Sequence, residues 1–271
     1  MKKAVIGVVV VLIVAVAAIL IVPSVINWNT YKPRLIAMAE DATGRRLAVD
    51  GDLGLTILPS PALSMVDVRL SNAPGGSADS MIALERLEVE IALWPLLRRE
   101  IRVRTVRLIK PVVDLEILAD GTPNWIFQAA NDDGPGTEGG ADTPGDETGA
   151  LAGVSLEKFE IEDGTLVFRN ASTGTEERIE RLSAELSAAA LASGPYVAKG
   201  SLTVRGLPLE FDLSVGDLAA PGSIPVSAEF VVERAGVAAV FAGQISAPSP
   251  DARVRGSFEL SGEDLRVAGA V

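Results

Sequence analysis

The sequence contains no cysteine and no histidine, and aromatic residues make up only 4% of its 271 positions. Without cysteine the chain forms no disulfide and has no thiolate nucleophile, so the sequence does not record a redox compartment. Without histidine it has no imidazole base and no histidine ligand for zinc or haem. A GxSxG elbow, an HExxH helix, a Walker loop and a CxxC pair are also missing. We therefore expect a protein that is not an enzyme and that holds no metal and no other cofactor.

Nucleic acid is an unsuitable partner, because the formal net charge of −12 would repel a phosphate backbone. The charge is spread unevenly along the chain. Residues 1–23 carry +2 and residues 24–128 carry −1, whereas residues 129–150 carry −6 and residues 151–271 carry −7. These changes in composition divide the chain into an N-terminal segment, a nearly neutral part, an acidic linker and an acidic distal part.

The N-terminal segment predicts a transmembrane anchor over residues 1–23. Lys2 and Lys3 precede Ala4–Val22, a run of 19 residues without a polar side chain. As a helix this run would be about 29 Å long at ~1.5 Å per residue, which matches the roughly 30 Å hydrocarbon core of a bilayer. Lysines on its N-terminal side favour a cytoplasmic N-terminus, with the rest of the chain exported. A cleaved signal peptide with a site at Ala15-Val16-Ala17 is the alternative, but the apolar residues that follow this site favour the anchor.

A short helix and then strands are expected after the anchor. Apolar residues recur at helical spacing, Pro33 suits a first turn and Gly44 suits a C-cap, so the helix is predicted over Pro33–Ala42. From Arg46 onward apolar and polar residues alternate, which is typical of strands with one buried face. Residues 24–128 are interpreted as a membrane-proximal β-domain with an N-terminal helix.

The acidic segment and the distal half differ sharply from each other. Residues 129–150 contain no large apolar side chain, so they are predicted to be an acidic, Gly/Pro-rich linker or a long exposed loop. Residues 151–271 alternate regularly, and a change of phase at Gly206 predicts a tight turn between antiparallel strands. Only Glu176–Leu191 is ambiguous, because its alanine content would also suit a helix. We expect a mainly β fold, a long curved antiparallel sheet of roughly 14–16 strands that continues through residues 151–271.

Several short motifs follow one another along the chain. They are Thr43-Gly44-Arg45, Gly51-Asp52-Leu53, Pro59-Ser60-Pro61, Leu70-Ser71-Asn72-Ala73-Pro74, Ala92-Leu93-Trp94-Pro95-Leu96-Leu97, Lys110-Pro111 and Asp120-Gly121-Thr122-Pro123-Asn124-Trp125. In this order and spacing they resemble the AsmA family of bacterial envelope proteins. The match is strong over residues 1–128, whereas residues 154–271 match only in style, and family members are generally much longer than this chain.

The resemblance implies a single-pass inner-membrane protein with a periplasmic body, which begins like a chorein domain and continues as a β-groove. It also implies a part in moving phospholipids between the inner and outer membranes and in outer-membrane assembly. The implied partners are phospholipid acyl chains, the inner membrane and other periplasmic or outer-membrane proteins. Within the motifs, the residues expected to have structural roles are Gly44, Arg45, Pro59, Pro61, Asn72, Trp94, Pro95, Pro111, Asn124 and Trp125.

The apolar face of the strands is the candidate binding surface. A sheet with one continuous apolar face either packs on a second sheet as a sandwich or curls around an apolar ligand. We favour an open groove with an apolar concave face that holds acyl chains, and the alternative is a closed sandwich that acts as a non-transporting scaffold regulating outer-membrane protein assembly. The residues expected to line the groove are Leu53, Leu55, Ile57, Val66, Val68, Leu70, Leu87, Val89, Ile91, Leu202, Val204, Leu209, Phe211, Leu213, Phe230 and Phe258.

Two charged clusters have a plainer interpretation than a functional site. Asp50 and Asp52 form the closest carboxylate pair, as a hydrolase would need, but Asp50-Gly51-Asp52 is better explained as a polar turn. An arginine cluster could contact lipid headgroups, and the favoured interpretation is the solvated side of one strand and a turn. Its members are Arg98, Arg99, Arg102, Arg104 and Arg107.

Overall fold

The computed structural model describes residues 27–56, 60–92, 95, 102–127, 156–188, 193–220, 222–246 and 253–262. The predicted anchor at residues 1–23 and the predicted linker at residues 129–150 lie outside these ranges. Within the described ranges, no helix is long and apolar enough to cross a membrane. The anchor therefore stays a prediction from the sequence.

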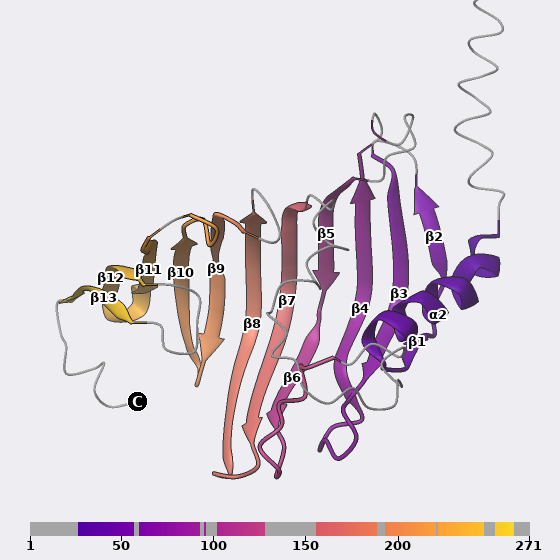
Figure 1. Ribbon diagram of the computed structural model, residues 1–271, viewed down its shortest axis with the longest axis horizontal. Coiled ribbons are helices and arrows are strands. Elements are labelled where there is room, and N and C mark those ends of the chain that lie inside the picture. The colour runs from indigo at the N-terminus through magenta and orange to yellow at the C-terminus, as the bar shows by residue number, and fades with distance from the viewer. Residues whose placement is uncertain are drawn as a thin grey trace, which may run out of the picture.

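The described strands form one sheet of 13 strands, which lie side by side in Figure 1. The elements are η1 (Trp28–Tyr31), α2 (Lys32–Thr43), β1 (Leu47–Val49), β2 (Leu53–Thr56), β3 (Ala62–Ser71), β4 (Ser80–Ile91), β5 (Val103–Ile109), β6 (Val112–Ile117), β7 (Leu156–Asn170), β8 (Thr175–Ala188), β9 (Tyr196–Val204), β10 (Leu207–Val215), β11 (Ile224–Val232), η3 (Glu233–Ala235), β12 (Val237–Ile245) and β13 (Val254–Gly262). A mainly β fold is confirmed. No second sheet packs on this one among the strands described, as a sandwich would require.

The strand order follows the chain from β1 to β13. The path is β1-β3-β4-β5-β7 and then continues in sequence order to β13, while β2 pairs with β3 and β6 pairs with β4 and β7. Most pairs are antiparallel, as expected. The exceptions are β5 and β6, which both pair with β7 in parallel.

The predicted helix is present as α2, one residue longer at each end than expected. Pro33 lies in its first turn, where a missing N–H costs no hydrogen bond. Gly44 ends the helix with a left-handed φ of 64°, and its N–H donates to the Glu40 carbonyl at 2.8 Å. The predicted C-cap is therefore confirmed.

The distal half also follows the sequence closely. Arg205 and Gly206 form a two-residue turn with φ of 48° and 79°, which joins β9 to β10 as the change of phase predicted. Within the ambiguous segment, residues 176–188 belong to strand β8, and residues 189–191 lie outside the described ranges. Among the described distal residues, the single helical turn is η3.

The buried apolar core is small and lies beneath α2, which crosses the β1–β4 end of the sheet in Figure 1. Val49, Val68 and Leu84 are its buried members, and Ile36 of α2 packs against them. The partly buried residues around this core are Leu47, Met65, Ile82, Leu87 and Leu108. The helix thus covers one end of the sheet only.

A line of left-handed residues crosses the middle of the sheet. Asp67 in β3, Lys110 between β5 and β6, Asp163 in β7 and Arg181 in β8 have φ of 52°, 47°, 52° and 50°, although none is glycine. A left-handed residue in a strand introduces a local bulge, after which the alternation of faces is shifted. The sheet can therefore keep apolar side chains on one face along strands whose sequence alternation breaks.

This shift moves one predicted groove residue to the other face. The alternation in the sequence groups Val66 with Val68 and Leu70. In the structure Val66 lies opposite Arg86, and Met65 packs against the core that contains Val68. Val66 therefore faces away from the core because the left-handed Asp67 interrupts the alternation between them.

Candidate functional site

Two unbroken rows of apolar residues cross one face of the sheet. Directly opposed residues on neighbouring strands point to the same face, so the pairing register can be followed from β2 to β13. Row one is Leu55, Leu63, Val89, Val106, Phe159, Leu186, Ala198, Leu213, Ala228, Phe241 and Phe258. Row two is Leu53, Met65, Leu87, Leu108, Ile161, Ala184, Gly200, Phe211, Phe230, Ala239 and Leu260. We call the face that carries both rows the apolar face.

The apolar face is covered at one end and exposed at the other. Leu53 of row two is only 4% exposed at the end that α2 covers. At the far end, Phe230, Phe258 and Leu260 are 40%, 68% and 46% exposed. Most residues between these ends are half-buried. Beyond α2, this face is an extended apolar surface.

The structure places most of the predicted groove residues on the apolar face. Leu53, Leu55, Leu87, Val89, Phe211, Leu213, Phe230 and Phe258 belong to the two rows. Val68, Leu70, Leu202, Val204 and Leu209 lie on the same face outside the rows, and Ile91 pairs with Val103 at the end of β4. Val66 lies on the opposite face, and Ile57 lies outside the described residues.

The groove candidates chosen from the sequence omit several row members on β3, β5, β7, β12 and β13. They are Leu63, Met65, Val106, Leu108, Phe159, Ile161, Phe241 and Leu260. A usable signal was present in β7, where Phe159 and Ile161 alternate with Lys158 and Glu160. The parallel pairing of β7 with β5, which aligns these residues with Val106 and Leu108, is not visible in the sequence.

The opposite face carries a charged row between the two apolar rows. Its members are Ser64, Glu88, Arg107, Glu160, Glu185, Lys199, Asp212, Glu229, Val240 and Glu259. Arg107 Nε lies 2.6 Å from Glu160 Oε2, and Lys199 Nζ lies 2.8 Å from Asp212 Oδ2. Such pairs keep this face hydrated and give the sheet two chemically distinct sides.

Among the ion-paired carboxylates of the charged row, Glu160 is the most buried, with 16% of its side chain exposed. Burial on its own would raise its pKa. Hydrogen bonds from Lys158 and Arg107 outweigh that effect, so the pKa of Glu160 is lowered. The carboxylate is therefore stabilised in its charged form by two cations on neighbouring positions.

Phenylalanine rings on the apolar face lie against glycines of the same strand or of the neighbouring strand. A methyl group added at Gly200 would lie 2.9 Å from the ring of Phe211, its direct partner. A methyl group at Gly243 or Gly256 would come within 2.6 or 2.7 Å of the Phe241 ring. The glycines thus leave space that the rings occupy.

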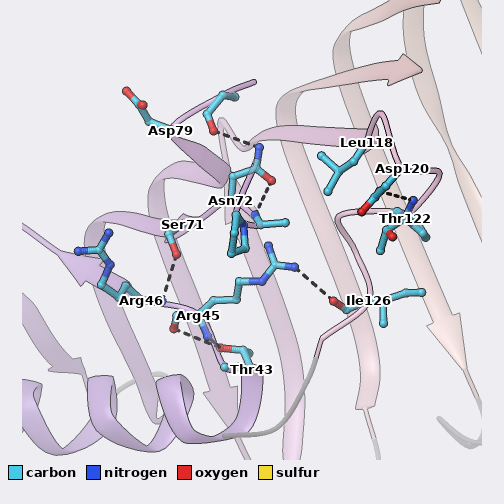
Figure 2. Close-up of a pocket in the computed structure, with 15 residues that line it drawn as sticks. Thr43, Arg45, Arg46, Ser71, Asn72, Asp79, Leu118, Asp120, Thr122 and Ile126 are labelled. Carbon is cyan, nitrogen blue, oxygen red and sulfur yellow. Dashed lines mark hydrogen bonds between the residues drawn. The ribbon is translucent and has the colours of Figure 1, made fainter. Parts of the chain in front are cut away.

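The family-like motifs meet at the end of the sheet beside the C-terminus of α2. A cavity of about 710 Å³ is lined there by residues 43–46, residues 71–74 and parts of residues 118–126. Figure 2 shows Arg45 reaching from the end of α2 toward Ile126, with Asn72 beside it. Residues from three motifs, far apart in the sequence, therefore form one structural cluster.

Asn124 holds this cluster together and is completely buried. Its side-chain amide donates to Asn72 Oδ1 and to the Asp114 carbonyl, both at 2.8 Å. Its Oδ1 accepts from the Glu116 N–H at 2.9 Å. One side chain thus ties the loop after β3 to β6, which explains why an asparagine with both donor and acceptor groups occupies this position.

Arg45 fastens the end of the same segment to α2. Its Nη2 donates to the carbonyls of Asn124 and Ile126 at 2.7 and 3.2 Å, and its guanidinium lies 5.4 Å from the centre of the Phe127 ring. Its Nη1 is buried without a hydrogen-bond partner. Burial lowers the pKa of this guanidinium.

The remaining motif residues differ in their surroundings. Pro61 and Pro111 are buried, Pro95 is half-buried and Trp125 is 38% exposed. Pro59 and Trp94 lie outside the described residues.

The described members of the charged clusters identified in the sequence have separate polar partners. Asp50 forms an ion pair with Arg69, and Asp52 accepts a hydrogen bond from Asn29 at 3.0 Å, so the two carboxylates are engaged separately. Arg104 and Arg107 form ion pairs with acidic residues of β4 and β7, while Arg98 and Arg99 are not among the described residues. In the described part of the chain, acidic side chains form no group of three or more suited to a metal ion.

Comparison with known proteins points to the same family as the motifs in the sequence. The family model described as "AsmA family" matches residues 1–204. The AsmA family protein YhjG of Escherichia coli (strain K12) is 31% identical over 134 residues, which cover 45% of this chain and 19% of that protein. Protein AsmA of the same organism is 26% identical over 104 residues, which cover 38% of this chain and 16% of that protein. The matched region thus spans less than a fifth of either relative, and no solved structure matches the chain significantly.

Proposed function

Because this chain belongs to the AsmA family, we propose that it is an inner-membrane-anchored periplasmic protein that holds phospholipid acyl chains against the apolar face. Residues 4–22 are the anchor, the N-terminus is cytoplasmic, and the sheet lies in the periplasm with the apolar face as the concave wall of a groove. The role is transport of phospholipid between the inner and outer membranes in support of outer-membrane assembly, together with other envelope proteins. The protein catalyses no reaction.

The observation that carries the proposal is the continuity of the two apolar rows. Both run from β2 to β13 without a polar residue, while the charged row occupies the other face. A large exposed apolar patch marks a binding surface. Burial of an acyl chain contributes about 0.8 kcal/mol per methylene group. This attraction has no preferred direction, so a bound chain can slide along the rows.

The decisive experiment places a photo-crosslinking residue on each face of the same strand. We expect a crosslinker at Phe211 to capture phospholipid in cells, and one at Asp212 to capture none. Asp212 is the matched control, because it is the next residue in β10 and faces the ion-paired side. Mass spectrometry of the adducts identifies the lipid. Equal capture at both positions, or none at Phe211, would reject the groove.

A second experiment separates lipid binding from folding. Phe230 is 40% exposed, so Phe230→Asp should leave the melting temperature nearly unchanged. The same variant should lose lipid capture at Phe211, which lies directly opposite in β10, because an unpaired carboxylate in contact with an acyl chain costs on the order of several kcal/mol. A collapsed melting transition would instead mean that protein covers this face.

The topology is tested independently of the lipid. A reporter fused after Val271 should be exported, and the protein should stay in the membrane fraction after carbonate extraction. Recovery of a soluble chain that begins at Ala18 would contradict the anchor.

A further inference from the structure

Helix α2 and the sheet enclose an apolar cavity at the covered end of the two rows. The cavity measures about 230 Å³. On the helix side it is lined by Lys32, Leu35, Ile36 and Ala39. Their spacing of three, one and three residues is that of a single helical stripe. The inward face of α2 is therefore a cavity wall as well as a cover for the core.

The opposite wall of the cavity is formed by the beginnings of both apolar rows. It consists of Leu47, Val49, Leu53, Leu63, Met65, Val68 and Leu87, all apolar. Leu63 belongs to row one, and Leu53, Met65 and Leu87 belong to row two. Since Leu87 lies directly opposite Leu108 of β5, the cavity wall is continuous with the rows beyond the helix.

Lys32 supplies the positive charge in this otherwise apolar lining. Its Nζ donates to the Gly51 carbonyl at 2.6 Å, which uses one of the three N–H donors of an ammonium group. The two acidic residues that flank Gly51 have other partners in the described structure: Asp50 pairs with Arg69, and Asp52 accepts a hydrogen bond from Asn29. The ammonium therefore keeps donors for an anion, at the end of α2 that is closest in sequence to Ala4–Val22.

From this arrangement we propose that the cavity beneath α2 receives one acyl tail of an anionic lipid whose headgroup binds Lys32. This inference rests on the proposed function and specifies where on the apolar face a lipid begins. At about 30 Å³ for a group the size of a water molecule, the cavity holds roughly seven or eight methylene groups. An apolar cavity of this kind stays dry and accepts an apolar ligand. The rest of a longer tail then continues along the two rows.

A pair of alanines on α2 provides a matched test. Ala39 lines the cavity, whereas Ala37 is exposed on the same helix. Ala39→Leu fills the cavity, and Ala37→Leu makes the same chemical change on the outer surface. With a photo-crosslinking residue at Leu63 of the full-length protein in cells, we expect lipid adducts that fall roughly tenfold in Ala39→Leu and stay unchanged in Ala37→Leu. A second crosslinker position at Leu35, on the helix side of the cavity, tests the same prediction if substitution at Leu63 disturbs the local fold.

The headgroup contact is tested with Lys32→Gln, which keeps a donor for the Gly51 carbonyl but removes the charge. The purified full-length protein is given palmitate, palmitoyl lysophosphatidylglycerol or neutral monopalmitin, each below its aggregation concentration. We expect Lys32→Gln to weaken binding of the anionic probes by about tenfold and to leave monopalmitin unchanged. A preference for palmitate over the phospholipid, or the reverse, identifies a carboxylate or a phosphate as the preferred head.

The possible results separate this inference from the proposed function. Adducts at Phe211 without adducts at Leu63 or Leu35 would reject the cavity and leave the groove standing. Adducts at Leu63 that Ala39→Leu does not reduce would also reject the cavity. An equal effect of Lys32→Gln on all three probes would reject the headgroup contact. Absence of adducts at all three positions would reject both the cavity and the groove.

Discussion

Replacing Asn124 by alanine should destabilise the protein more than any comparable surface change. Asn124 is 0% exposed, and its side chain makes three hydrogen bonds to three different residues. In Asn124→Ala the Glu116 N–H and the Asp114 carbonyl lose their partners inside the protein. At about 1 kcal/mol for each lost bond, the free energy of unfolding should fall by roughly 3 kcal/mol.

The predicted loss is large enough to measure by thermal unfolding. A domain of this size loses roughly 2–4 °C of melting temperature per kcal/mol, so we expect a decrease of about 6–12 °C in circular dichroism melts. Asn170→Ala is the matched control, because Asn170 Oδ1 accepts from the N–H groups of Ser172 and Thr173 in an exposed turn. Water replaces those bonds, so the control should lose about 1 kcal/mol or less. Equal small decreases in both variants would refute the reasoning that Asn124 locks the motif cluster.

Three further predictions concern the two faces of the sheet and the linker. Val66→Glu should be tolerated, because Val66 lies opposite Arg86, whereas Met65→Glu should prevent folding, as judged by melting temperature and soluble yield. Because the pKa of Glu160 is lowered, its ion pairs contribute fully to stability above its ordinary pKa of 4.5, and this contribution is lost as the pH falls through the lowered pKa. Glu160→Gln should therefore be less stable than the wild type near neutral pH. In unfolding titrations its free energy of unfolding should fall less steeply with acid. Deletion of Pro135–Gly149, a segment without large apolar residues, should leave the β-structure content and melting temperature unchanged, and a large loss of stability would show that the segment packs on the sheet.

Periodicity in the sequence predicted the strands well because most of them are regular. In β10, Leu209, Phe211 and Leu213 alternate with charged residues, and the structure places the two sets on opposite faces. The same logic assigned Val66 to the wrong face. A left-handed residue such as Asp67 shifts the alternation, and an aspartate carries no sequence signal strong enough to reveal that shift in advance.

Pairing between distant strands was beyond the reach of the sequence. Strands β6 and β7 are separated by residues 118–155, and their parallel arrangement depends on the path of that long connection. The family resemblance marked Asn124 as a motif residue, yet its role depends on Asn72 approaching from a different loop. Local patterns determine which residues are apolar on each strand, whereas the register between strands determines whether those residues form continuous rows.

The distribution of large and small residues in the rows suits a surface for mobile chains better than a closed core. In a core, facing layers interdigitate, so large side chains project into the partner layer. Here the Phe211 ring lies against Gly200 and the Phe241 ring lies against Gly243 and Gly256, so these rings fill space above glycines of their own sheet. Alanines occupy several of the intervening row positions, and their short side chains project little from the sheet between the rings. An apolar face of this kind offers contact along the described length of the two rows, and the cavity beneath α2 is the place where a helix closes over it.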